Sequence, residues 1–190
     1  MPKTYGQYCG LAKALDHIGD RWTLLIVREL LVAPRRYSGI REALPGIATN
    51  LLADRLRCLE GDGLIERSTD GTYALSDAGR GLETPIHDLV LWGGRWMGER
   101  AEGETFRPQW LVVALQALLP RRRPGAIELH VDGTVIHIDR TRVGVGPLDA
   151  PDAVVEAPAE RILGVAAGRA PFSSLTVRGD RRIAAAVLGS

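Results

Sequence analysis

The sequence predicts an α+β protein in two parts: a mainly helical N-terminal part and a small C-terminal part with a mainly antiparallel sheet. The chain has 190 residues, of which 45% are hydrophobic, enough for two modest cores. Apolar residues recur at helical spacing up to about residue 60, whereas short strand-like runs prevail from about residue 127. Between these parts, residues 101–105 carry no large apolar side chain and form a predicted linker.

Four helices are expected in the first 62 residues. The first covers residues 11–18, and Asp20 is well placed to cap the second. The third opens near Ser38, a good capping residue, and stops at the Pro-Gly turn of residues 45–46. The fourth follows at once, and its buried face is expected to consist of Leu52, Leu56 and Leu59.

The period then changes from helical to extended. Residues 63–67 and 72–75 are short extended runs separated by a segment with an Asp-Gly pair, which predicts a β-hairpin. Ser76 is placed to cap a further helix, interrupted by Pro85 and later by a Gly-Gly pair. Helix, helix, tight turn, helix, hairpin and helix is the order of a winged helix-turn-helix.

The second part alternates between helices and strands. A helix is expected over residues 109–119 and another over 159–167, and Asp180 is placed to cap a closing one. Strands are expected at 127–131, 134–139, 142–145, 153–157 and 175–178. We therefore expect a winged helix-turn-helix domain over residues 1–100, a linker over 101–107 and an α+β domain over 108–190.

Charge is distributed unevenly along the chain, although the net charge is only +1. Residues 21–57 contain seven arginines against three acidic residues, whereas residues 58–100 contain four arginines against eight acidic residues. A local positive segment is what a phosphate-binding surface requires, even in a nearly neutral molecule. The charge pattern taken alone is explained equally well by ordinary solvated helix faces.

Composition also limits the compartment and the chemistry. No run approaches the roughly 18 apolar residues that cross a bilayer, and the first residues lack a signal-peptide pattern, so we expect a cytoplasmic protein without a membrane partner. Cys9 and Cys58 lie far apart in the sequence and are more simply interpreted as thiols than as a disulfide. The four histidines lack ligand spacing, so no metal or other cofactor is expected.

Several ordered motifs in the first half resemble a known family. They are LDHIGDRWTLLI at residues 15–26, REL at 28–30, RYS at 36–38, LPGI at 44–47 and GLI at 63–65. With their spacing, they resemble HxlR-type regulators, relatives of the MarR group, over about residues 5–98. The resemblance implies a homodimer that binds double-stranded DNA, with one recognition helix per subunit in the major groove and one wing at the flanking minor groove.

The fourth helix is the expected recognition helix. Thr49 and Asn50 lie at its start, where side chains and free N–H groups face the groove, and Arg57 lies on the same exposed face. Asn50 is suited to adenine, and Arg57 to guanine or phosphate. The full set of expected DNA-contacting residues is Arg36, Ser38, Thr49, Asn50, Ala53, Arg55 and Arg57. The alternative for Arg55 and Arg57 is that they only solubilise the helix.

The wing departs from the family pattern, since its tip is short and carries Asp70, which is unfavourable near phosphate. Cys9 lies where members of the family often have a cysteine, which several of them use to sense oxidants or electrophiles. Lys13, one turn on, could supply a cation that lowers the pKa of Cys9. The alternative is that Cys9 is a small buried apolar residue.

The expected dimer interface consists of Leu11, Leu82, Ile86, Leu89, Trp92 and Trp96. The alternative is that these residues pack on the core of their own subunit.

Over about residues 108–190 the chain resembles the sterol carrier protein-like fold, on the runs AVVEA at residues 153–157, ERILGVAAGR at 160–169 and LTVRGD at 175–180. That resemblance implies an apolar tunnel for a hydrophobic small-molecule effector. The candidate lining residues, for which plain core packing is the alternative, are Trp110, Leu111, Leu115, Phe172 and Leu175.

The favoured interpretation is a transcriptional repressor whose DNA binding is modulated by such an effector. A thiol-based regulator acting through Cys9 and a lipid- or partner-binding module without DNA readout are the alternatives. No enzyme is expected, because no nucleophile elbow or phosphate loop occurs. His137 and Asp139 would share a strand face and could act as acid and base, but chance produces this pattern easily.

Overall fold

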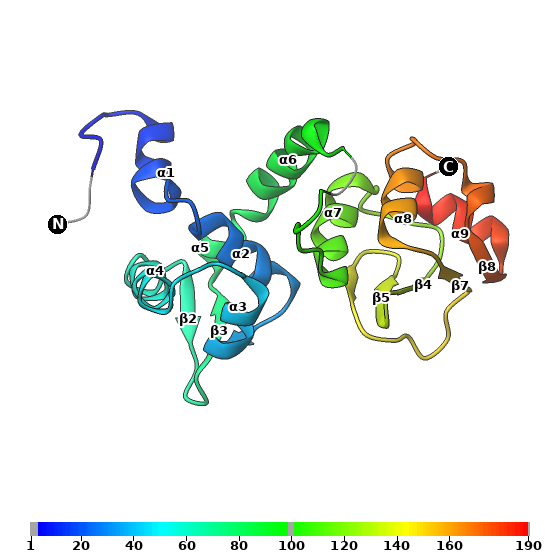
Figure 1. Ribbon diagram of the computed structural model, residues 1–190, viewed down its shortest axis with the longest axis horizontal. Helices are drawn as coiled ribbons and strands as arrows, with labels where there is room; N and C mark the ends of the chain where they lie inside the picture. The colour runs from blue at the N-terminus through cyan, green and yellow to red at the C-terminus, as the bar shows by residue number, and fades with distance from the viewer. Residues whose placement is uncertain (1–3, 99–100, 190) are drawn as a thin grey trace. The chain divides into compact units, whose positions relative to one another are not determined.

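A computed structural model describes residues 4–98 and 101–189, and it confirms the predicted α+β fold class. The chain forms two compact units, Met1–Ile86 and His87–Ser190 (Figure 1). The division between them falls within helix α6 (Glu83–Gly93). The domain limits expected from the sequence stay a prediction.

The first unit contains the predicted helices in the predicted order. Helices α1 and α2 are followed by α3, a tight turn and α4, whose buried face is formed by Leu52, Leu56 and Leu59 as expected. The turn uses Gly46 at φ +90°, a conformation that favours glycine. The helix bounds are α1 Gly10–Ile18, α2 Thr23–Val32, α3 Tyr37–Ala43, α4 Thr49–Gly61 and α5 Asp77–Arg80.

Two of the three predicted caps in this unit are confirmed. Asp20 Oδ1 accepts the backbone N–H groups of Trp22 and Thr23 at 2.8 and 3.2 Å, and Ser76 Oγ accepts that of Gly79 at 3.1 Å. The prediction for Ser38 was wrong, because Ser38 lies inside α3 and the residue before the helix is Arg36. Arg36 is held in extended backbone by strand pairing, so the chain passes directly from strand to helix.

A three-stranded antiparallel sheet completes the first unit. Strands β2 (Ile65–Arg67) and β3 (Thr72–Leu75) form the predicted hairpin. Strand β1 (Arg35–Arg36) pairs with the other side of β3 and was not predicted. The sheet order is therefore β1-β3-β2.

The helix predicted after Ser76 is divided in two. Helix α5 ends at Arg80, and α6 begins at Glu83, so that Pro85 lies in the first turn of α6, where its missing N–H costs little. Gly79 is buried against the Leu64 carbonyl, with no room for a Cβ atom. A short 3-10 helix, η1 (Gly94–Trp96), follows the Gly-Gly pair.

The second unit is the predicted α+β arrangement. Its five-stranded sheet has the order β6-β5-β4-β7-β8, and all pairs are antiparallel except the parallel pair β4–β7. Asp180 caps α9 as expected, by accepting the N–H groups of Arg182 and Ile183. The element bounds are η2 Pro108–Trp110, α7 Leu111–Leu118, β4 Ile127–Val131, β5 Thr134–Ile138, β6 Val143–Val145, β7 Ala153–Glu156, α8 Ala159–Ala166, η3 Phe172–Ser174, β8 Thr176–Gly179 and α9 Arg181–Leu188.

The connection between β6 and β7 crosses strands β5 and β4. Within this connection, the Leu148 N–H donates to Glu128 Oε1 at 2.7 Å, while His130 Nε2 lies 2.9 Å from Glu128 Oε2. The side chain of Glu128 therefore holds the crossing segment to the middle of the sheet. Among the described residues, no helix is long and apolar enough to cross a membrane.

Candidate nucleic-acid interface

Helix α4 presents its first turn to solvent. Thr49 and Asn50 are both exposed, and the helix begins directly after Ala48, which caps it without a side-chain hydrogen bond. The hydroxyl of Tyr37 donates to the Thr49 carbonyl at 2.8 Å and so ties the start of α4 to α3. The sequence predicted Tyr37, part of the RYS motif, as a core residue of the third helix and gave it no role at the DNA-binding site; it is half-buried. The result is a fixed helix start with an open face.

The exposed face of α4 continues to Arg57. Its side chain is 73% exposed and forms an ion pair with Asp54 one turn earlier. Ala53 lies between, half-buried. An exposed ion pair of this kind is worth at most about 1 kcal/mol, so the guanidinium can exchange Asp54 for another partner at little cost.

Arg55 has a different environment. It is only one-third exposed, and its Nη1 lies 3.5 Å from Asp20 Oδ2, the carboxylate that also caps α2. This geometry gives Arg55 an intramolecular partner and links α4 to the start of α2. Contact between Arg55 and DNA phosphate stays a prediction. The same holds for Ser38, which is exposed on α3.

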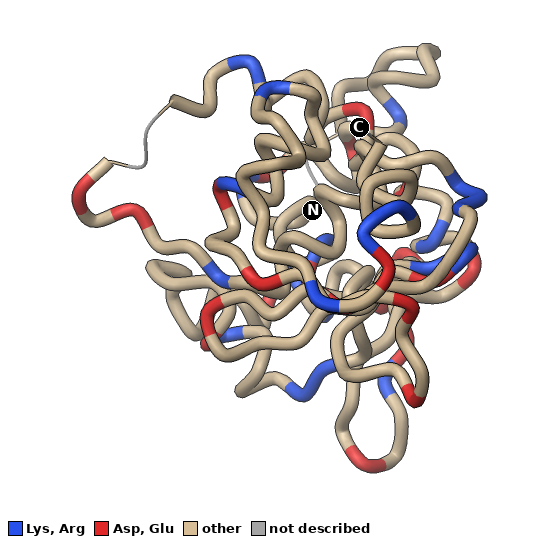
Figure 2. Tube along the Cα trace, turned by 90° about the vertical axis from the view of Figure 1, so that its right-hand side faces the viewer, with Lys and Arg blue, Asp and Glu red and all other residues tan. Residues whose placement is uncertain are grey.

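The hairpin tip is acidic, as Figure 2 shows at the bottom of the view. Hydrogen bonds from Ser68 and Thr72 hold the pKa of Asp70 well below its ordinary value, so this carboxylate stays ionised. Its Oδ2 lies 3.3 Å from Nη2 of Arg36, the predicted phosphate contact. The wing thus binds one of the expected DNA-contacting cations itself.

Beneath this surface lies a buried carboxylate that sequence reasoning missed. Glu29 is fully buried, Arg28 Nη2 donates to its Oε1 at 2.7 Å, and Arg35 Nη2 lies 3.7 Å from its Oε2. Arg35 belongs to β1 and precedes Arg36. The signal was a charged residue within the apolar run of α2. Glu29 therefore links α2 to the strand that carries Arg36.

Cys9 is exposed and lies at the residue before α1, which contradicts the alternative of a buried apolar residue. Its pKa is lowered by hydrogen bonds from the backbone N–H groups of Ala12 and Leu11. The expected role of Lys13 was wrong, since its ammonium group lies 3.7 Å from Asp16 and does not contribute to the shift. Free helix N–H groups supply the positive potential instead.

The residues expected at a dimer interface are mostly exposed. Leu11 is 69% exposed on α1, and Trp92 and Trp96, whose ring centroids lie 4.3 Å apart, are 56% and 66% exposed. Leu89 is exposed, Leu82 is half-buried and Ile86 is buried. An interface through these residues stays a prediction.

The candidate ligand-lining residues divide into two groups. Leu111, Leu115 and Leu175 are buried in the second unit, whereas Trp110 and Phe172 are half-buried. Their burial fits both core packing and the wall of a ligand site. The tunnel stays a prediction.

His137 and Asp139 make structural contacts. His137 Nδ1 lies 3.0 Å from the Gly146 carbonyl, and Asp139 Oδ1 accepts the N–H groups of Thr141 and Arg142, each at 2.7 Å. Among the described residues, no group of three or more potential ligands could hold a metal ion.

A helix-turn-helix with an exposed second helix and a hairpin wing defines the class of protein: a DNA-binding transcriptional regulator. Residues 17–101 match the family model of the HxlR-like helix-turn-helix. The chain is 33% identical over 91 residues to the HTH-type transcriptional regulator YvaP of Bacillus subtilis, covering 45% of this chain and 84% of that protein. The chain belongs to the HxlR-like helix-turn-helix family.

Two further proteins are similar to about half of the chain. The chain is 39% identical over 103 residues to the HTH-type transcriptional regulator Rv3095 of Mycobacterium tuberculosis, covering 51% of this chain and 64% of that protein. The crystal structure of quinone-bound YodB from B. subtilis is 30% identical, with a TM-score of 0.43, and the match covers 46% of this chain and 99% of that one.

Proposed function

We propose that this chain is a homodimeric, sequence-specific repressor that reads its operator with α4 and responds to a hydrophobic small molecule in its C-terminal unit. The observation that carries the DNA-binding proposal is the exposed first turn of α4, fixed by the hydrogen bond from Tyr37. In this proposal, the dimer represses transcription by binding over a promoter and excluding polymerase.

Base recognition in this proposal depends on Asn50 and Arg57. The amide of Asn50 can donate to and accept from adenine, and Arg57 can reach a guanine edge after releasing Asp54. Each bidentate contact discriminates against the wrong base by about 1–3 kcal/mol. Arg36 contacts phosphate once it leaves Asp70, and Arg55 serves mainly to hold α4 against α2.

Dimerisation is proposed through the exposed apolar residues of α6 and η1, with Leu11 of α1 as a separate contact. Leu89, Trp92 and Trp96 expose more apolar surface than scattered single residues usually do, and the rings of Trp92 and Trp96 are in contact. A twofold dimer would bury this patch on both subunits and present one α4 helix per subunit to successive major grooves. Sedimentation equilibrium should give a dimer that Trp92→Ser converts towards monomer.

The test of DNA recognition uses duplexes from the region upstream of the chain's own gene, located by footprinting. The double variant Asn50→Ala/Arg57→Ala should lose the preference for this duplex over random-sequence DNA. The matched control Arg80→Ala/Thr84→Ala, which alters two exposed residues outside α4, should retain it. An unchanged preference in the first variant refutes the assignment of α4 and favours a module that binds lipid or protein instead.

The C-terminal unit is proposed to be sterol carrier protein-like. Its α+β order and the apolar side chains of Leu115 and Leu175 support this, and an effector there regulates only if it binds the DNA-competent and DNA-incompetent states with different affinity. A fluorescent long-chain fatty acid should bind the full chain and weaken DNA binding, and Leu115→Trp should reduce both effects. Saturation without any change in DNA affinity eliminates the proposal.

The exposed thiol of Cys9 supports a second candidate, regulation by oxidants or electrophiles. In that case a quinone should change DNA affinity in the native chain and in Cys58→Ser, but not in Cys9→Ser. A quinone response that persists in Cys9→Ser excludes this mechanism.

A further inference from the structure

Two loops of the C-terminal unit are joined by one buried arginine. Arg123 is 7% exposed; its backbone N–H donates to the Arg140 carbonyl at 3.0 Å, and its Nη1 donates to the Asp139 carbonyl at 3.0 Å. These bonds connect the segment after α7, residues 120–126, to the turn between β5 and β6, residues 139–142. Arg121 and Arg122 are thereby brought to the same end of the sheet as Arg140 and Arg142.

Both loops have defined shapes. Asp139 accepts the N–H groups of Thr141 and Arg142, which fixes the turn that carries Arg140. In the other loop, Gly125 packs so closely against Ile183 and Asp152 that no Cβ atom would fit. The four arginines are therefore presented from a preorganised backbone.

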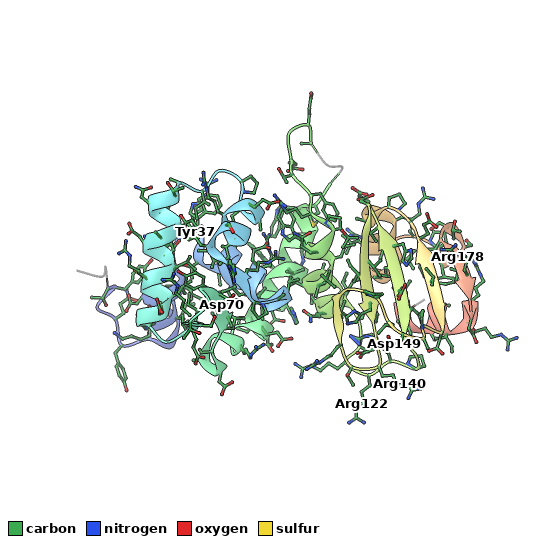
Figure 3. All side chains as sticks on the ribbon, turned by 90° about the horizontal axis from the view of Figure 1, so that it is seen from below. Tyr37, Asp70, Arg122, Arg140, Asp149 and Arg178 are labelled. Atoms are coloured by element: carbon green, nitrogen blue, oxygen red, sulfur yellow. The ribbon has the colours of Figure 1, made fainter. Side chains whose placement is uncertain are left out.

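The arginine patch, defined as Arg121, Arg122, Arg140 and Arg142, is exposed and open to a partner. Within the described part of the chain, none of its guanidinium groups lies within 4.0 Å of a carboxylate. Figure 3 shows Arg122 and Arg140 projecting from the same end of the unit, with Asp149 labelled nearby.

The arginines of the first unit differ in this respect. Those expected to contact DNA have carboxylate partners in the free chain: Arg36 pairs with Asp70 and Arg57 with Asp54. Each must leave its partner before it meets a phosphate, which lowers its net contribution to DNA affinity. The arginines of the patch have no carboxylate partner among the described residues that they would have to leave before binding a phosphate.

We propose that the arginine patch is a second phosphate-binding surface, which contacts the DNA backbone without reading sequence; this inference rests on the proposed DNA-binding function. Guanidinium groups bind phosphate oxygens in a planar, two-pronged geometry and are less strongly hydrated than ammonium groups. A lipid surface is the less suitable partner, because surface-bound segments combine basic with large apolar side chains, and the loops of the patch expose none of the latter.

The experiment measures the salt dependence of DNA binding by the full chain. The patch variant is Arg121→Gln/Arg122→Gln/Arg140→Gln/Arg142→Gln. The control removes the same charge from exposed positions elsewhere in the unit, as Arg169→Gln/Arg178→Gln/Arg181→Gln/Arg182→Gln. Circular dichroism and thermal unfolding check that both remain folded. Dissociation constants are measured by fluorescence anisotropy between 50 and 200 mM NaCl, for the footprinted duplex and for a random duplex of equal length.

If all four arginines of each subunit neutralise phosphates, the proposed homodimer loses about eight contacts, and the slope of log K against log salt should become shallower by about 7 in the patch variant. Native binding should then fall on the order of 10,000-fold more than variant binding across this salt range. The patch variant should lose affinity for both duplexes by the same factor, so that the preference between them is unchanged. The control variant should keep the native slope.

Three results overturn the proposal. An unchanged slope in the patch variant does so, as does an equal change in patch and control variants. Patch-dependent binding to phosphatidylglycerol vesicles with an unchanged DNA slope assigns the patch to a lipid surface instead. The proposed function fails separately, since Asn50→Ala/Arg57→Ala tests the preference between duplexes and the patch variant tests the slope that both duplexes share.

Discussion

Replacing Glu29 with alanine removes a fully buried carboxylate that faces two arginines. Loss of one partner from a buried ion pair costs about 3–5 kcal/mol, because the remaining charge stays desolvated. The side chains of Arg28 and Arg35 are 19% and 22% exposed, so both can partly rehydrate. We therefore expect the loss of unfolding free energy to lie near the lower end, about 3 kcal/mol.

The loss must be measured locally, because two units need not unfold in one step. Native-state hydrogen exchange gives opening free energies for peptides of α2 and β3, with peptides of α7 and β4 as the internal reference. Glu29→Gln keeps the shape and should cost about 2 kcal/mol through weakened hydrogen bonds. Glu66→Gln, on an exposed position of β2, should stay within about 0.5 kcal/mol.

Two results would refute this reasoning. One is a loss of opening free energy below about 1 kcal/mol in α2 for the alanine variant. It would mean that water solvates Arg28 and Arg35 as well as the Glu29 carboxylate does. The other is an equal loss in α7, since Glu29 contacts would then not explain the effect.

Three further predictions concern charge. Hydrogen bonds from His130 and from the Leu148 N–H lower the pKa of Glu128 below its ordinary 4.5, so its carboxylate stabilises the C-terminal unit above that pH and the contribution is lost as pH falls through the lowered value. Glu128→Gln should therefore flatten the acid side of the stability curve, and an unchanged acid side contradicts this. Asp70→Asn should release Arg36 and tighten DNA binding about threefold at low salt, less at high salt; weaker binding would show that the wing needs its carboxylate. Cys9 should react faster with iodoacetamide than Cys58 at pH 7, as mass spectrometry of the alkylated peptides can show; equal rates would mean that the helix N–H groups do not activate it.

Local sequence patterns predicted the helices and the hairpin well. The leucines of α4 and the caps at Asp20, Ser76 and Asp180 depend on residues within a few positions, so the sequence alone determines them. Strand β1 was missed, because a strand of two residues exists only through its pairing with β3. The prediction that Ser38 caps α3 failed for the same reason.

The sequence predicted which residues of the candidate site are exposed, but not the carboxylates with which its arginines form ion pairs. The helical spacing placed Asn50 and Arg57 on one exposed face, as the structure has them. Ion pairs join distant segments, and charge counting along the chain does not show them: Arg55 with Asp20 and Arg36 with Asp70 are examples. The arginine patch was similarly hidden, because Arg123 brings together two loops separated by the length of two strands.

The parallel pair β4–β7 sets an order for synthesis and folding. Ile127 pairs with Ala153, so β4 meets this neighbour only after β5, β6 and the crossing segment have been made. A nascent or truncated chain that ends before residue 153 leaves β4 as an open edge, with Leu129 and its neighbours uncovered on one side. Such an edge can pair with another copy of the same unfinished chain. Pairing with β7 therefore covers the edge of β4 and moves the exposed edge of the sheet to the short strand β8.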